Sequence, residues 1–388
     1  MNAFERMLHD QDVFLTIKEI NQQPAVWRRT LQKVTGMRDK IASFLIAAGV
    51  GGAPPPTVIL TGAGSSEYVG RSIESVLRRR LACEVATVPT THLVTHWDSV
   101  FHPERDYLLV SFARSGNSPE SGATFRCVAD RLPRARQVAI TCNAEGELAR
   151  LATGRPGSLC ILLPEETNDR SLVMTSSFSS LALAGLSLGF MGLHELLETA
   201  VEKAARGAAR IIVEYGDMLE DFARRGFSRA CFLGSNTLYG CMQEGRLKMQ
   251  EMTAGRVAAA YDSFLGLRHG PQVFVNTECV VVASLSSHPK VRRYEMDLLR
   301  ELKMKKQGCG TLVICGRADR EVREVSSDVI ELSPFEEPLE DDYRPLTDVV
   351  VCQILATFKS IGLGLSPDNP SPEGIINRVV QGITIYPW

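Results

Sequence analysis

The chain has 388 residues, and at about 150 residues per domain this length predicts two domains. Hydrophobic residues make up 44% of the chain and charged residues 23%, a balance typical of globular proteins that excludes disordered and fibrous classes. The 43 basic and 45 acidic residues leave a net charge of −2, so no basic excess supports nucleic acid as a partner.

Residues 1–50 have the pattern of helices, and the breaker GVGGAPPP at residues 49–56 ends them. Helical sequence then alternates with four strand-like apolar runs, at residues 57–64, 107–116, 137–146 and 158–166. Strands alternating with helices predict a parallel sheet with helices on both faces. Residues 172–193 are uncharged and long enough to span a membrane. Six of them are Ser or Thr and a charged helix follows, so we interpret the segment as a helix buried in the core.

The same series of strand-like runs recurs in the second half, at residues 230–237, 280–289, 311–320 and 328–337. Corresponding strand ends are 170 to 174 residues apart, as with Gly62 and Gly234. A nearly constant offset in the same order indicates an internal duplication of one α/β unit. We therefore predict an α/β fold with an N-terminal helical segment at residues 1–50 and two domains at residues 51–210 and 211–388.

Ligands of open α/β sheets bind where strands end and helices begin. In the first such turn, TGAGSSEY, Gly62 and Gly64 permit a sharp bend, and Ser65 and Ser66 begin the next helix. A dinucleotide fingerprint needs a third glycine where this chain has Glu67, so no NAD site is predicted.

The second turn, SFARSGNSPES, gathers Arg114, Ser115 and Ser118 at the start of another helix. Hydroxyls and free backbone N–H groups at a helix N-terminus form an anion site. Since no Lys-[ST] P-loop is present, a phosphomonoester fits better than a nucleoside triphosphate. Ser118 could equally be only the N-cap of the helix that begins with Pro119.

In the second copy, the helical sequence LYGCMQEGRLKMQEM places Glu244, Lys248 and Glu251 together along the edge of an apolar stripe. A carboxylate base beside a cation is the minimum for proton transfer next to a carbonyl. The alternative is a ladder of ion pairs on the helix surface.

Histidines offer two further candidates. His269 in GLRHGP precedes a Gly-Pro turn, so it could lie on an exposed catalytic loop or be structural. His92, His96 and His102 lie close in sequence, but Leu93 follows His92 and the HExxH pattern is missing, so no metal site is predicted.

Taken together, the motifs resemble the sugar isomerase (SIS) superfamily in a tandem arrangement. Within it they are most similar to the AgaS-like galactosamine-6-phosphate deaminase/isomerase group, also called tagatose-6-phosphate ketose/aldose isomerases. The motifs that carry the resemblance cover nearly the whole chain: TGAGSSEY, SFARSGNSPES, EGRLKMQEMTAG, YDSFLGLRHGP, SSHP and NRVVQGITIYPW. The resemblance implies two flavodoxin-like parallel sheets.

The related isomerase domain of glucosamine-6-phosphate synthase binds the sugar phosphate on its Ser/Thr loop. The resemblance assigns this role to Ser115 and Ser118, with Ser65 or Ser66 from the first turn. Arg114 stands where that relative has Gln, a departure within the same loop.

The resemblance also assigns the catalytic roles. Glu251 is implied as the base and Lys248 as its cationic neighbour, with Glu244 as the supporting carboxylate. His269 is implied to open the sugar ring of the neighbouring subunit, which implies a homodimer. The relative has a tail lysine where this chain has Gln381, so no tail-lysine role carries over.

The function implied is the conversion of an aldohexosamine 6-phosphate, galactosamine 6-phosphate above all, to a ketose 6-phosphate and ammonia, with no metal or redox cofactor. One alternative is a plain aldose–ketose isomerase. Another is a non-enzymatic sugar-phosphate sensor, but the first 50 residues contain no basic helix-turn-helix segment. The N-terminus lacks a signal-peptide pattern and the ten cysteines form no CxxC motif, so we expect a cytoplasmic protein without a membrane partner.

Overall fold

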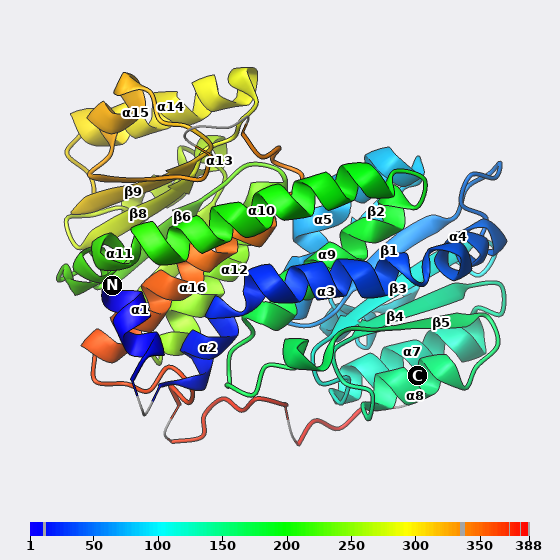
Figure 1. The fold of residues 1–388 in the computed structure, drawn as a ribbon. Helices are drawn as coiled ribbons and strands as arrows, with labels where there is room; N and C mark the ends of the chain where they lie inside the picture. Colours follow the sequence, from blue (N-terminus) through cyan, green and yellow to red (C-terminus); the bar gives the residue numbers. More distant parts are fainter. Residues whose placement is uncertain (11–12, 334–337, 372, 381, 387–388) are drawn as a thin grey trace. The chain divides into compact units, whose positions relative to one another are not determined.

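A computed structural model describes residues 1–10, 13–333, 338–371, 373–380 and 382–386 (Figure 1). Residues group by contact into two compact units, each built on a parallel sheet of five strands. The first-sheet unit consists of Ala25–Asp169, Ser176–Thr199 and Gly374–Trp388. The second-sheet unit consists of Met1–Pro24, Arg170–Thr175 and Ala200–Glu373.

The first sheet has the strand order β2 (Val85–Thr87), β1 (Thr57–Thr61), β3 (Tyr107–Ala113), β4 (Arg136–Thr141), β5 (Ser158–Leu162). The helical elements around this part of the chain are α3 (Gln23–Thr35), α4 (Arg38–Ala47), α5 (Ser65–Leu81), α6 (Thr90–Leu93), η1 (Trp97–Ser99), α7 (Pro119–Arg131), α8 (Glu147–Thr153), η2 (Glu165–Thr167), α9 (Ser176–Ser187), η3 (Leu188–Phe190) and α10 (His194–Glu214). On one face, Leu109 packs with Trp97 and Val128 from η1 and α7. On the other, α5 and α9 pack so closely that a Cβ on Gly185 would lie 2.5 Å from Ile73. Since successive residues of a strand face opposite sides, the fully buried β3 has to be apolar on both.

The second sheet repeats this plan, with the order β7 (Ala258–Asp262), β6 (Arg229–Leu233), β8 (Cys279–Ser284), β9 (Gly310–Cys315), β10 (Asp328–Glu331). Its helical elements are α1 (Ala3–Leu8), α2 (Leu15–Asn21), α11 (Gly216–Arg224), α12 (Thr237–Met252), α13 (Phe264–Leu267), η4 (Pro271–Phe274), α14 (Pro289–Met304), α15 (Arg320–Val325) and α16 (Pro345–Gly362). Leu298 of α14 packs on one face with Val281 and Val313. Two helices of this unit, α12 and α16, pack against each other so closely that a Cβ on Gly245 would lie 2.6 Å from Cys352 Sγ.

The predicted α/β duplication is confirmed, because the two sheets have the same strand order and each is a flavodoxin-like 2-1-3-4-5 arrangement. All eight apolar runs contain a strand, but two strands were missed. Val85–Thr87 is only three residues long, and Ala258–Asp262 begins with three alanines, which lack the β-branched pattern of a strand. The contact units do not test the limits proposed for the duplicated segments, residues 51–210 and 211–388, which stay predictions.

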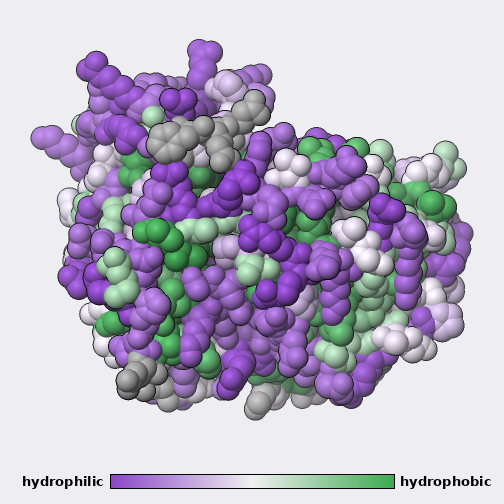
Figure 2. All heavy atoms as spheres, in the orientation of Figure 1, coloured by the Kyte–Doolittle hydropathy of each residue, from purple (hydrophilic) through white to green (hydrophobic). Residues whose placement is uncertain are grey.

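The uncharged segment forms α9, and every residue of that helix is buried. One of its hydroxyls bonds inside the protein to a distant residue: Ser179 Oγ accepts a hydrogen bond of 2.8 Å from the indole of Trp27. None of the described helices combines the length and apolarity that crossing a bilayer requires. The buried-helix interpretation is confirmed. Figure 2 shows hydrophilic residues over most of the visible face, with hydrophobic ones in small groups.

Candidate active site

The first turn ends β1 and begins α5 in a very confined space. A Cβ on Gly62 would lie 2.5 Å from the backbone of Ser66, so only glycine fits there. Gly64 precedes the helix with φ 57°, a left-handed conformation that favours glycine. The result is that Ser65 and Ser66, both buried, begin α5 at the carboxyl end of the sheet.

The second turn joins β3 to α7 at the same carboxyl end of the sheet, because β1 and β3 are adjacent parallel strands. The Nδ2 group of Asn143 donates to the carbonyl of Ser115 at 2.9 Å and so supports the loop. Ser118 stands at the N-cap position, yet its side chain makes no capping hydrogen bond. Its hydroxyl instead lies 2.6 Å from that of Ser121. Ser118 is therefore the N-cap residue of α7 by position but not through its side chain. The serines form a hydroxyl-lined turn suited to an anion, and their anion-binding role stays a prediction.

Arg114 occupies this turn differently from its neighbours. Its side chain is buried, and Nη2 donates to the carbonyl of Arg378 at 2.7 Å. Arg378 in turn donates to the carbonyl of Asp169 at 2.8 Å and to Oδ1 of Asn168 at 2.6 Å. Arg114 therefore holds the C-terminal segment, and its phosphate-binding role stays a prediction. Gln381, the other departure, lies outside the described residues.

The carboxylate and lysine candidates of the second copy meet on α12. Lys248 Nζ lies 3.2 Å from Glu244 Oε1 and 2.6 Å from Glu251 Oε2. The side chains of Glu244 and Lys248 are 0% exposed, and that of Glu251 is 24% exposed. The predicted position at the edge of the core is wrong for Glu244 and Lys248, because both side chains are fully buried. A surface ion-pair ladder is excluded for the same reason.

The charges of this cluster decide which member can take a proton. Burial lowers the pKa of Lys248, but the carboxylates of Glu244 and Glu251 outweigh it and raise the pKa above its ordinary value. Lys248 therefore stays an ammonium group at neutral pH and cannot act as a base. It can favour negative charge that develops nearby. Of the two carboxylates, only Glu251 is partly exposed, so it is the candidate base.

His269 lies on the loop between α13 and η4 and is exposed, as one of the two sequence interpretations expected. Gly270 follows it with φ 119°, in the left-handed region that favours glycine. Glu301 of α14 holds the loop from both sides: it accepts from Arg268 Nε at 2.8 Å and from Gln272 Nε2 at 3.0 Å. No sequence motif pointed to Glu301, because it is one of many charged residues on the amphipathic helix α14.

The histidines at residues 92 and 96 form a pair of their own. The rings of His92 and His96 stack with centroids 4.9 Å apart. Over the described ranges, no group of three or more His, Cys, Asp or Glu side chains is arranged to hold a metal ion.

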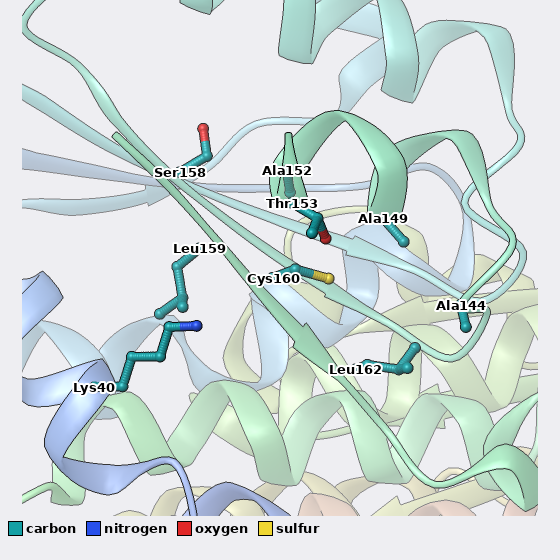
Figure 3. Close-up of a pocket in the computed structure, with 9 residues that line it drawn as sticks. All are labelled: Lys40, Ala144, Ala149, Ala152, Thr153, Ser158, Leu159, Cys160 and Leu162. Carbon is teal, nitrogen blue, oxygen red and sulfur yellow. The ribbon is translucent and has the colours of Figure 1, made fainter. Parts of the chain in front are cut away.

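A pocket of about 300 Å³ beside α8 and β5 is lined by Lys40, Thr153, Cys160 and six mostly apolar neighbours, none of them a predicted site residue (Figure 3).

The serine turns belong to the first-sheet unit, whereas the Glu244–Lys248–Glu251 cluster and His269 belong to the second-sheet unit. Within each unit, the structure brings together the serines at one sheet edge and the three charged residues on one helix. The roles of all these residues stay predictions.

No protein-family model matches the chain. It is 34% identical over 379 residues to the D-galactosamine-6-phosphate deaminase AgaS of Escherichia coli, a match that covers 96% of each chain. Its structure is similar to that of tagatose-6-phosphate ketose/aldose isomerase from Escherichia coli, with a TM-score of 0.86 and 32% identity over 96% of this chain and 97% of that one. The C-terminal domain of glucosamine-fructose-6-phosphate aminotransferase from Francisella tularensis shares the fold, with a TM-score of 0.76 and 16% identity over 93% of this chain and 99% of that domain. The resemblance inferred from the motifs is confirmed over nearly the whole chain.

Proposed function

Because the chain belongs to the family of AgaS D-galactosamine-6-phosphate deaminases, we propose that it converts galactosamine 6-phosphate into tagatose 6-phosphate and ammonia. The observation that carries the chemistry is the cluster on α12, where a buried ammonium group lies 2.6 Å from a partly exposed carboxylate. Such a pair suits proton abstraction next to a carbonyl, because the cation favours the negative charge that enolisation creates.

In the proposed mechanism, His269 assists opening of the sugar ring and frees the C1 aldehyde. Glu251 removes the proton from C2, and the electron pair of that C–H bond forms the C1–C2 double bond of an enolamine while the aldehyde oxygen O1 takes up a proton to become a hydroxyl. The same carboxyl group returns the C2 proton to C1, and the amine gives up one proton, in balance with the one taken up by O1, which leaves a ketimine at C2. Water then hydrolyses the ketimine to the ketone and releases ammonia, so the overall reaction is a hydrolytic deamination.

The phosphate group is assigned to the hydroxyl-lined turn of Ser115 and Ser118, with Ser65 and Ser66 from the first turn. A helix N-terminus and hydroxyl donors stabilise such an anion without a lysine. No step of this reaction requires a metal or redox cofactor.

We also propose a homodimer in which His269 acts on the substrate of the neighbouring subunit. Leu265 and Val273, on either side of His269 in sequence, are 47% and 86% exposed. A subunit interface at this loop would cover both of these apolar side chains. The ten cysteines are all unpaired, which supports the proposed cytoplasmic location.

The proposal is tested by ammonia release across a panel of hexosamine and hexose 6-phosphates. We expect ammonia from galactosamine 6-phosphate at a rate well above that from glucosamine 6-phosphate. Tagatose 6-phosphate serves as the product standard, and unphosphorylated galactosamine as the control for the phosphate requirement. Turnover of hexose 6-phosphates with no ammonia from any hexosamine 6-phosphate would instead identify a plain aldose–ketose isomerase. No turnover of any of them, with binding retained, would favour a sensor.

A further inference from the structure

The turn that follows β8 in the second sheet corresponds to the serine turn after β3 in the first. Each follows the middle strand of its sheet, and each leads into a helix that begins with proline, Pro119 in α7 and Pro289 in α14. In the second copy the turn contains Ser286 and Ser287. It is therefore the place where the duplicated fold would hold a second anion.

This second turn already holds a carboxylate, that of Asp341. The backbone N–H of Ser287 donates to Asp341 Oδ1 at 2.8 Å and the Ser287 hydroxyl at 2.7 Å. The hydroxyl of Ser286 donates to Asp341 Oδ2. Nη1 of Arg344, whose side chain is 0% exposed, lies 3.4 Å from Oδ1. Backbone N–H, two hydroxyls and a guanidinium on one carboxylate are the donor set of an oxyanion site.

An aspartate in the corresponding connection of the first copy, between β5 and α9, does something else. Asp169 precedes Asp341 by 172 residues, the offset of the duplication. Its carboxylate accepts from the hydroxyl of Ser176 at 2.5 Å and from the backbone N–H of Ser177 at 2.8 Å, at the start of α9. In the first copy this aspartate therefore binds the start of a helix, whereas in the second copy it binds the turn.

We propose that the turn after β8 is a second oxyanion site, which the chain fills with its own Asp341 carboxylate. A phosphate group then binds only at the first-copy turn, and the duplicated chain has one substrate site. The comparison with the first copy rests on the phosphate role proposed above for Ser115 and Ser118.

The neighbouring charges limit what the opened site can take. Glu295 accepts from the backbone N–H of Ser286 at 2.7 Å, and Asp348 lies 2.6 Å from Arg344 Nη2. The negative charges of these carboxylates offset the positive charge of Arg344. An anion that replaces the Asp341 carboxylate would therefore be held mainly by hydrogen bonds. We therefore expect weak binding, in the millimolar range of phosphate concentration.

The experiment uses the full chain with Ser115→Ala, Ser118→Ala, Ser65→Ala and Ser66→Ala as the parent, so that all four hydroxyls assigned to the phosphate in the first copy are absent. Asp341→Ala is added, and thermal unfolding is followed with inorganic phosphate against chloride at matched ionic strength. A ligand that binds only the folded state stabilises it, so phosphate should raise the Tm of the Asp341→Ala variant by roughly 2–4 °C and leave that of the parent unchanged.

Asp342→Ala in the same parent is the matched control and should show no phosphate response. If Asp341→Ala does not fold, Asp341→Ser, which can keep one hydrogen bond to the turn, gives the same measurement. An equal response in parent and variant, a response of the Asp342→Ala control, or no response in a folded Asp341 variant would each overturn the proposal. The role of these four serines is judged separately, from the parent against the unaltered chain.

Discussion

Replacing Glu251 by Gln tests its proposed role as the base, because the substitution removes proton uptake and keeps the structural contacts of α12. Gln has nearly the same size and can still accept a hydrogen bond from Lys248, but it cannot take up the C2 proton. The fully buried Glu244 keeps Lys248 as its partner at 3.2 Å, so no buried charge is left without a counter-charge.

The structure sets the expected magnitudes. The lost ion pair involves a carboxylate that is 24% exposed. Its loss should lower the free energy of unfolding by about 1 kcal/mol or less. A general base contributes about 10²–10⁴ in rate, or roughly 2.7–5.4 kcal/mol of activation free energy. Lys248→Met is the contrasting variant: it leaves buried Glu244 without its cation and should cost about 3–5 kcal/mol of stability.

The assay combines kcat for ammonia release, exchange of the substrate's C2 hydrogen in D₂O, and thermal unfolding. We expect Glu251→Gln to lose turnover and exchange in parallel while Tm and phosphate affinity change little. A folded Glu251→Gln protein that turns over and exchanges at close to the unaltered rate would refute the reasoning. The base would then have to be sought first at Glu244.

Three further predictions concern the other candidate groups. Ser115→Ala with Ser118→Ala should raise KM for the phosphorylated substrate strongly, since hydrogen bonds to a charged group contribute roughly 1.5–3 kcal/mol each, and an unchanged KM would remove this turn from the site. Mixed dimers of His269→Ala and Glu251→Gln should regain activity that neither variant has, because one composite site is intact; verified heterodimers without activity would show that His269 does not act across subunits. Hydrogen bonds from Lys305, Gln272 and Arg268 lower the pKa of Glu301 to about 2 from its ordinary 4.5, so its contribution to stability is present above pH 4.5 and lost as pH falls toward 2. Glu301→Gln should therefore flatten the decline of unfolding free energy between pH 5 and 2 in urea titrations, and an unchanged slope would contradict this.

The sequence alone predicted the alternation of strands and helices, the duplication and the glycine-dependent first turn. Each of these depends on local pattern: apolar runs alternate with amphipathic segments, and Gly62 and Gly64 allow a bend that other residues would obstruct. The edge strands β2 and β7 lack such a pattern, so only their hydrogen bonding to a neighbouring strand identifies them.

The tertiary structure alone decided which charged residues are buried and what they contact. The spacing of Glu244, Lys248 and Glu251 put them near one another on a helix, but only the folded chain shows that Glu244 and Lys248 are fully buried while Glu251 is partly exposed. The same helix packs against α16, which begins more than ninety residues after α12 ends. Likewise, Asp341 reaches a turn 54 residues before it, while Asp169 in the corresponding connection of the first copy binds residues only seven and eight positions away. Contacts between distant segments depend on the path of the whole chain, and local residue patterns do not encode that path directly.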